Sequence, residues 1–469
     1  MKKIILICLS ILILPQLAGA ALNLKLTKGI KALIPIAVLP FAKPTPQSMT
    51  DVSAVINQDL SYSGQFSVSN NADFNQFPII LSNVNFDYWQ NYNLNALVIG
   101  SVVAQGGNQY QVNFTLVNLF KNKISDASEQ TSVNSSNNSA TNTIASPTTT
   151  ANNSPESNPA NSAILLQQSF VVKQSDLRQV GHKIANLIYQ QLTGQPGYFT
   201  SKIAYVAVKR NLNINPSYSL MVADYDGYDT KPLIISNEPI ATPAWSPQGD
   251  QLAYISYENK GLPALYTINI NSMQRHLVGS FTGSLEGTPA WSPDGSKLAI
   301  ALSKHGSTVI DLASLQGHLT PLISSWGINT EPSWLKTGDA LVFTSNRNGT
   351  PQLYQLDIAS QEVKQLTYNG NYNTTGSYSP LGDKIVLVHG DGANYNIGLL
   401  DLTLQQFTVI TNSNVANSPS FSPNGNVILY STLMSGHEEL IITSLDGLTS
   451  LILPNLGNSD KVQPTWSPV

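Results

Sequence analysis

Side chains that could perform catalysis or bind a metal are few in this sequence and lie far apart. No two of the six histidines have metal-ligand spacing, and no H-E-x-x-H motif is present. No G-x-S-x-G segment occurs either, so the nucleophile turn of the α/β-hydrolases is missing. Loops can still bring distant residues together, so spacing alone does not exclude an active site. From the residues we predict no catalytic residue, no metal site and no cofactor.

One acidic segment has the beginning of a calcium-binding loop. Asp224 and Asp226 occupy the first and third positions of such a loop, and Gly227 and Asp229 follow shortly after. The twelfth position of that loop must be a glutamate that binds with both oxygens, and here it is Ile235. We therefore interpret the segment as a β-hairpin turn that contains a glycine.

The composition narrows the classes of function. Charged residues make up 11% of the chain and the formal net charge is −4, so nucleic-acid binding by phosphate neutralisation is not indicated. The 469 residues are too many for one ordinary core, and we expect two domains.

The first twenty residues have the pattern of a signal peptide. Lys2 and Lys3 precede an apolar run, and residues 18–20 form a small-residue cleavage site, so we predict cleavage near Ala20 and export to the periplasm. A membrane anchor is the less favoured alternative, because spanning needs about 20 apolar residues. The single cysteine, Cys8, lies in this leader, which leaves the mature chain without a thiol, disulfide or lipid anchor.

An aromatic-Ser-Pro-x-Gly phrase recurs about every 45 residues, the spacing of a four-stranded propeller blade. The glycine supplies a positive φ in the turn, and the aromatic side chain can fill the gap between blades. The aromatic positions are Trp245, Trp291, Trp334, Tyr378, Phe421 and Trp466.

The last repeat stops at Val469, before its turn and second strand, and the missing piece occurs much earlier. Residues 201–206 match residues 296–301, so we expect them to pair with the C-terminal strand and close the ring. An open array is less favoured, because it would expose a blade edge. We predict an all-β six-bladed propeller over residues 194–469.

Residues 21–193 do not repeat and predict a small α+β domain. Apolar periodicity indicates strands at 34–41, 96–103, 110–116 and 164–172, a helix after Thr50 or Ser48 that ends near Gly64, and a helix over 176–192. Between the last two strands, residues 121–163 are mostly Ser, Asn, Thr and Ala, and we predict a disordered insertion there, with a functional tether as the alternative.

The ordered combination of a leader, an α+β domain and Trp-Ser-Pro blades that end on Trp466 resembles the TolB family of the Tol–Pal system. Other pieces of the resemblance are Pro35–Phe41, Leu192–Gly194, Ile203–Val206, Asp224–Tyr228, Ala301–Lys304 and Asn329–Pro332. The chain departs from the family pattern in its insertion and in the third repeat, where Leu335 and Lys336 replace Ser-Pro.

The resemblance implies a monomeric, non-enzymatic adaptor that serves envelope integrity and outer-membrane constriction at cell division. It implies that the propeller binds the outer-membrane lipoprotein Pal and that the mature N-terminus binds the inner-membrane protein TolA. The segment expected to bind TolA alternates apolar and polar residues and can add to a sheet edge, although a strand of its own domain is equally compatible. It comprises Leu22, Asn23, Leu24, Lys25, Leu26 and Thr27.

The expected Pal surface follows from blade geometry. The Ser-Pro turn follows the innermost strand, so the residues that begin that strand lie on the opposite face, together with the turns after the second strands. We expect the binding face to include Glu286, Thr288, Ser303, Lys304, Thr330, Glu331 and Arg347. An ordinary solvated rim is the alternative for these residues. For the whole protein, the alternatives are a secreted propeller enzyme or a solute-binding propeller.

Overall fold

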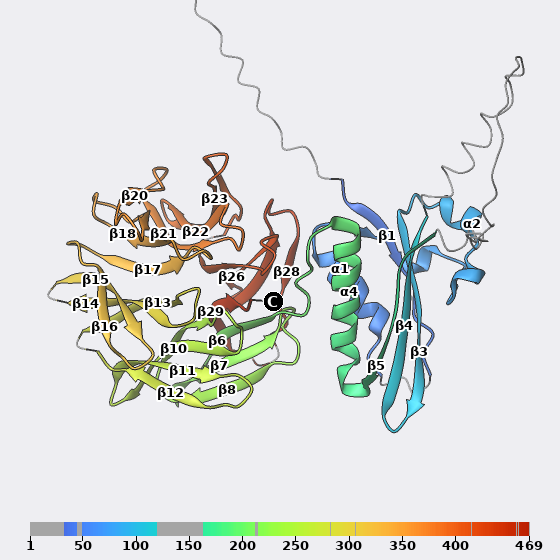
Figure 1. Ribbon diagram of the computed structural model, residues 1–469, viewed down its shortest axis with the longest axis horizontal. Helices are drawn as coiled ribbons and strands as arrows, with labels where there is room; N and C mark the ends of the chain where they lie inside the picture. Colours follow the sequence, from blue (N-terminus) through green and yellow to red (C-terminus); the bar gives the residue numbers. More distant parts are fainter. Residues whose placement is uncertain are drawn as a thin grey trace, which may run out of the picture. The chain divides into compact units, whose positions relative to one another are not determined.

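The computed structural model describes residues 32–44, 49–119, 163–211, 214–281, 283–304, 306–413, 415–455, 457 and 459–468. Residues 34–469 form one compact unit (Figure 1). The predicted leader, the segment 22–27 and the insertion up to residue 162 lie outside the described residues. Within the described part of the chain, no helix is long and apolar enough to cross a membrane.

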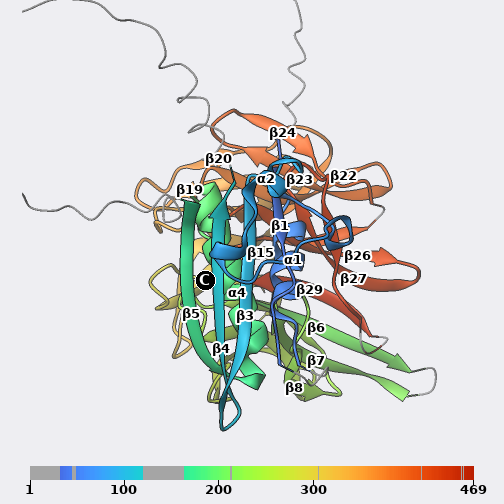
Figure 2. The same ribbon diagram turned by 90° about the vertical axis from the view of Figure 1, so that its right-hand side faces the viewer.

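The N-terminal domain is built on a five-stranded sheet with the order β2-β1-β3-β4-β5 (Figure 2). Strand β1 is parallel to both of its neighbours, and β3, β4 and β5 form an antiparallel meander. The strands are β1 (Ile34–Val38), β2 (Phe66–Val68), β3 (Ala96–Gly106), β4 (Gln109–Asn118) and β5 (Ile164–Lys173).

Two long helices, α1 (Val52–Tyr62) and α4 (Leu177–Thr193), pack on one face of this sheet. Helix α1 begins after Asp51, whose carboxylate accepts a hydrogen bond from the Ala54 amide, so the cap is neither of the residues predicted. Helix α4 ends at Gly194, which has a φ of 74° as a C-terminal glycine requires.

Short elements that the sequence did not reveal cover part of the other face. A second apolar cluster there joins Phe74 and Trp89 to Leu97 and Ile99 of β3. The covering elements are the 3-10 turns η1 (Asn71–Asp73) and η2 (Leu81–Asn83) and helix α2 (Phe86–Gln90), and a third turn, η4 (Gln174–Asp176), leads into α4.

The propeller consists of six four-stranded sheets, which confirms the predicted architecture. Four blades that are continuous in sequence follow one another along the chain. The first two are β9 (Ile240–Trp245), β10 (Gln251–Asn259), β11 (Leu262–Asn269) and β12 (Arg275–Gly279), and then β13 (Ser284–Trp291), β14 (Lys297–Lys304), β15 (Ser307–Ser314) and β16 (Leu319–Ile323). The next two are β17 (Asn329–Trp334), β18 (Ala340–Ser345), β19 (Gln352–Asp357) and β20 (Val363–Gln365), and then β21 (Tyr372–Tyr378), β22 (Lys384–Asp391), β23 (Asn394–Asp401) and β24 (Gln406–Val409). The remaining two are β25 (Ala416–Phe421), β26 (Val427–Met434), β27 (His437–Ser444) and β28 (Ser450–Ile452), and the split blade β29 (Asp460–Trp466), β6 (Lys202–Asn211), β7 (Ile214–Asp224) and β8 (Lys231–Ser236).

The split blade closes the ring as predicted. Strand β29 pairs antiparallel with β6, with Trp466 opposite Ile203. The Ser467 hydroxyl accepts a hydrogen bond from the Lys202 amide at 2.8 Å. The same bond occurs inside the continuous blades, for example from Lys297 N to Ser292 Oγ at 3.0 Å. The two ends of the propeller sequence therefore rebuild one ordinary turn without a peptide connection.

The acidic segment after β7 is a hairpin turn, as interpreted, with Gly227 at a φ of 84°. Two of its aspartates, Asp224 and Asp226, are nevertheless buried and so are not ordinary solvated turn residues.

Candidate functional site

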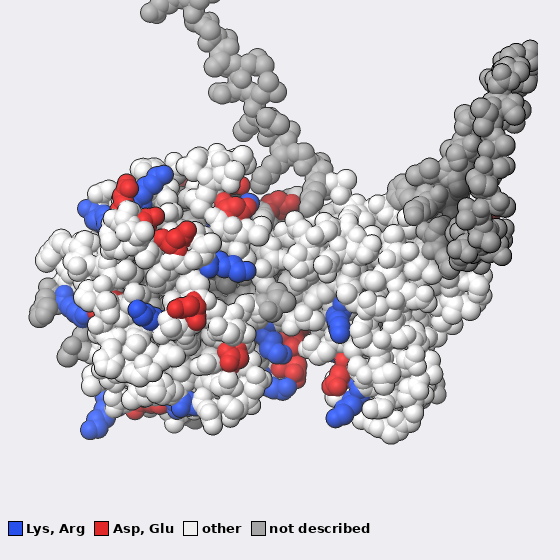
Figure 3. All heavy atoms as spheres, viewed as in Figure 1, with Lys and Arg blue, Asp and Glu red and all other residues white. Residues whose placement is uncertain are grey.

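The inner strands of the propeller enclose a channel of about 770 Å³. One end of its wall is formed by the aromatic-Ser-Pro turns, such as Ser246–Gln248, and the other by residues near the strand starts, such as Thr242 and Gln463. Figure 3 shows the charged side chains of the visible face dispersed among uncharged ones, without a large patch of one sign. Binding at this surface therefore depends on local groups more than on a long-range field.

The strand registers place the predicted Pal-binding residues at the end of the blades away from the Ser-Pro turns. In the second repeat, Glu286 lies opposite Ala301, whereas Trp291 lies opposite Leu298 next to the turn. In the third, Thr330 lies opposite Thr344, and Arg347 follows in the adjoining turn. Of the residues predicted for this face, Thr288 and Glu331 line the channel, and Glu286, Ser303, Lys304, Thr330 and Arg347 lie outside its lining.

Each inner strand contains an irregularity at which the backbone turns to positive φ. Five of these residues are not glycine and have φ values between 50° and 54°, which is strained backbone for such side chains. Sequence reasoning missed this ring, although each of the five stands three residues before the aromatic of its repeat. They are Thr242, Glu331, Thr375, Ser418 and Gln463, and Gly287 occupies the corresponding irregularity of the remaining strand.

Side chains of the ring tie neighbouring blades together. The Gln463 side chain in the split blade accepts a hydrogen bond at 2.8 Å from Thr242 N in the neighbouring blade. The Glu331 carboxylate accepts from Thr375 N at 2.8 Å and from the Thr375 hydroxyl at 3.0 Å, and also from Thr344 of its own blade at 2.8 Å. Glu331 therefore has a structural role that the sequence did not indicate.

The two cations predicted for this face also have partners inside their own blades. Lys304 pairs with the buried carboxylate of Asp311. Arg347 donates to Asn329 Oδ1 at 3.0 Å, and its guanidinium lies over the rings of Phe343 and Tyr354. These contacts hold the cations in place, so that a partner would meet them already oriented.

Large exposed aromatic side chains stand at the same end of the blades. Trp326 and Tyr368 are 79% and 73% exposed, in the loops that lead into the inner strands β17 and β21. Aromatic residues are enriched at the centres of protein interfaces. Sequence reasoning missed both residues, because they lie in loops outside the repeated phrase.

Comparisons with known proteins agree over almost the whole chain. Residues 22–124 match the family described as the TolB amino-terminal domain, and residues 189–469 match the TolB β-propeller domain. The Tol–Pal system protein TolB of Nitrosococcus oceani is 36% identical over 96% of this chain and 94% of its own length. That of Coxiella burnetii is 37% identical over 54% of this chain and half of its own length.

A solved structure supports the same assignment. The crystal structure of TolB from Acinetobacter baumannii superposes with a TM-score of 0.77 at 30% sequence identity, and the match covers 93% of this chain and 97% of that one. Both domains are thus similar to TolB, in the same order. The chain therefore belongs to the TolB family, whose members are named as components of the Tol–Pal system.

Proposed function

We propose that this protein is a non-enzymatic adaptor of the periplasm that links inner-membrane TolA to the outer-membrane lipoprotein Pal. In this role it serves outer-membrane constriction at division and the integrity of the envelope. The observation that carries the proposal is the TolB-type order of amino-terminal domain and propeller along nearly the whole chain.

We place the Pal site on the propeller face opposite the Ser-Pro turns. Exposed aromatics at Trp326 and Tyr368, oriented cations at Lys304 and Arg347, and the channel mouth beside them support this choice. Such a surface offers apolar contact area together with fixed hydrogen-bonding groups, which is the usual composition of a protein interface.

We assign TolA binding to the mature N-terminus, residues 22–27, which follow the proposed cleavage near Ala20. The support is the alternation of apolar and polar residues, which suits addition to a sheet edge.

Solute binding in the channel is the second candidate. The channel volume of about 770 Å³ lies within the range of small-molecule pockets. Its wall contains polar side chains from several blades, such as Glu331 and Gln463, which could orient a solute.

Affinity capture from a detergent-solubilised envelope extract tests the proposal. The mature protein, residues 21–469, is expected to retain Pal and TolA, whereas a matched variant without residues 22–31 is expected to retain Pal alone. Loss of both partners in the deletion variant would mean that the segment belongs to the fold. Capture of neither partner, with a small molecule copurifying, would favour solute binding.

A further inference from the structure

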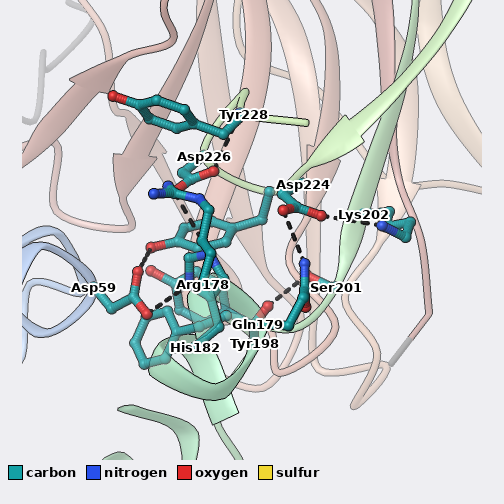
Figure 4. A network of polar contacts seen from close by, with 12 residues as sticks. Asp59, Arg178, Gln179, His182, Tyr198, Ser201, Lys202, Asp224, Asp226 and Tyr228 are labelled. Carbon is teal, nitrogen blue, oxygen red and sulfur yellow. Dashed lines mark hydrogen bonds and ion pairs between the residues drawn. The ribbon is translucent and has the colours of Figure 1, made fainter. Parts of the chain in front are cut away.

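A buried polar centre joins the N-terminal domain to the propeller (Figure 4). Asp59 comes from α1, Arg178 and His182 come from α4, and Tyr225 and Asp226 come from the turn after β7. The helices belong to the N-terminal domain and the turn belongs to the split blade. These residues therefore connect two parts of the chain that fold around separate sheets.

His182 lies between two carboxylates. Its Nδ1 is 2.8 Å from Asp59 Oδ2, and its Nε2 is 3.8 Å from Asp226 Oδ2. The imidazole is fully buried, and Nε2 has no hydrogen-bond partner. A ring with a carboxylate at each nitrogen has the surroundings of an imidazolium, in which both nitrogens carry a proton.

The balance of charge also requires a proton. Asp59 and Asp226 are both almost completely buried. Arg178 pairs with Asp226, and Tyr225 donates its hydroxyl to Asp59 at 2.6 Å without adding charge. With a neutral imidazole the centre would keep one uncompensated negative charge, and burial of such a charge is strongly unfavourable. A charged His182 makes the centre neutral.

The pKa directions agree with this geometry. Burial alone would lower the pKa of His182, but the hydrogen bond and charge of Asp59, together with the charge of Asp226, raise it above its ordinary value. Burial raises the pKa of Asp59 to about 6, against the opposing effect of His182. Both groups therefore hold protons more firmly when the two domains are in contact.

A metal ion is a poorer occupant than a proton. Ligand atoms of Asp59, His182 and Asp226 lie within 4.8 Å of one another, which fits a small cation in distance alone. The guanidinium of Arg178 already lies on Asp226, however, and would repel a divalent ion. One proton makes the buried centre neutral, whereas a divalent cation would leave it with a net positive charge.

We propose that a proton held on His182 between Asp59 and Asp226 fastens the N-terminal domain to the propeller. This contact, called the joint below, then releases a proton when it opens. The closed joint would then be favoured by acid and weakened by base. Between the open-state and the raised closed-state pKa of His182, the ratio of open to closed joint is expected to rise by up to tenfold per pH unit, and above the closed-state pKa it levels off. This behaviour is independent of which partner binds the propeller.

The two buried tyrosines at the joint do not titrate in this range, because burial raises the pKa values of Tyr198 and Tyr225 well above their ordinary range. Elsewhere, burial lowers the pKa of His389, which gives the opposite pH dependence near pH 6. The joint is therefore isolated by comparing variants and not from the wild-type pH profile alone.

Nuclear magnetic resonance of histidine ring nitrogens in the mature protein gives the direct test. His182 is expected to be doubly protonated at pH 7 and to titrate above the ordinary histidine value, and its signal is assigned with the variant His182→Gln. A neutral His182 ring at pH 7 would overturn the proposal. The protonation state is read on the wild-type fold, and the variant serves only to assign the signal.

Thermal unfolding from pH 6 to 9 gives the second test. The wild type is expected to lose stability relative to His182→Gln as the pH rises. The control His389→Gln removes the opposite dependence near pH 6 and is expected to keep the loss of stability at higher pH. Parallel curves for wild type and His182→Gln would contradict the proposal. So would stoichiometric Zn²⁺ binding that stabilises the wild type but not His182→Gln, since a metal would then occupy the site.

Discussion

Glu331 illustrates how a residue chosen for binding can first serve the fold. Glu331 has a positive φ, and its carboxylate accepts three hydrogen bonds, two of them from Thr375 in the next blade. Lys304 and Arg347 are likewise engaged within their own blades. A charge change at one of these positions therefore affects both stability and binding. Substitutions at exposed positions nearby can change binding without changing stability.

Replacing Glu331 with lysine is expected to lower the free energy of unfolding by about 1–3 kcal/mol, because the carboxylate that accepts from the amide and the hydroxyl of Thr375 is lost. Glu331→Gln keeps one acceptor oxygen and is expected to cost less. Urea unfolding followed by circular dichroism measures both. The control Glu286→Lys changes an exposed charge on the same face and is expected to stay within about 0.5 kcal/mol of wild type. Equal effects at the two positions would argue against the tie between blades.

The exposed aromatics test which face binds Pal. Trp326→Ala and Tyr368→Ala are each expected to weaken Pal binding by more than about 1 kcal/mol if they lie at the centre of the interface. The control Leu381→Ala removes a side chain that is 78% exposed in a Ser-Pro turn on the other face, and it is expected to have no effect. Isothermal titration with purified Pal measures all three. A loss at Leu381 alone would assign binding to the Ser-Pro face.

The polar joint shows the limit of sequence reasoning for single residues. His182 is separated by 123 positions from Asp59 and by more than forty from Asp226, so no spacing rule connects them. The acidic pattern at 224–229 resembled the start of a calcium loop, yet its two buried aspartates instead contact Arg178, Gln179 and His182 of α4. Only packing of the helix against the turn brings these groups together.

At the scale of elements, the repeated phrase predicted the blades because each copy specifies a complete turn. A serine hydroxyl accepts a hydrogen bond from the backbone amide at the start of the second strand, and a glycine supplies the positive φ of the turn. The third repeat shows which part is essential. Leu335 has no hydroxyl, yet its amide still donates to Ala340 O at 2.9 Å and Gly338 N to Leu335 O at 2.9 Å. The backbone bonds and the glycine suffice for the turn.

Short elements could not be predicted in this way. Strand β2 has three residues and helix α2 has five, too few to show a period in the sequence. Strand β2 depends on parallel pairing with β1, and α2 depends on burial of Trp89 beneath neighbouring rings. Both are consequences of tertiary contact, whereas α1 and α4 carry their own apolar stripes.

The closing strand has its own test. Deletion of Pro464–Val469 removes two of the five residue pairs between β29 and β6, together with the Ser467 bond to Lys202, and so opens two sheet edges; we expect aggregation or loss of cooperative unfolding. The control Trp466→Phe keeps the strand and an aromatic ring but loses the bond to Ser201, and it is expected to unfold cooperatively at a lower temperature. Thermal unfolding with light scattering distinguishes them. An unchanged melting curve for the deletion would count against a closed ring.

At the scale of the whole molecule, the insertion is expected to be dispensable for folding. Strands β4 and β5 are paired up to Val117 and Ile164, so the chain ends that flank the insertion are already close. Shortening a loop changes the closure entropy by only about 0.6 kcal/mol per halving of its length. Replacing residues 126–161 with Gly-Asn should therefore leave the melting temperature nearly unchanged. Loss of solubility in the shortened protein would show that the segment packs.

The bond between Lys202 and Ser467 also governs when the molecule can fold. It joins residues 265 positions apart, and β29 is the last of the strands that the structure describes. A ring that is closed by β29 cannot form before that strand has been made and exported, and non-local pairing of this kind is slow. Until then the pairing edge of β6 stays exposed in the unfinished blade, which also carries the turn that contacts α4. Accessory factors that cover exposed strands during export would have their greatest effect on this step.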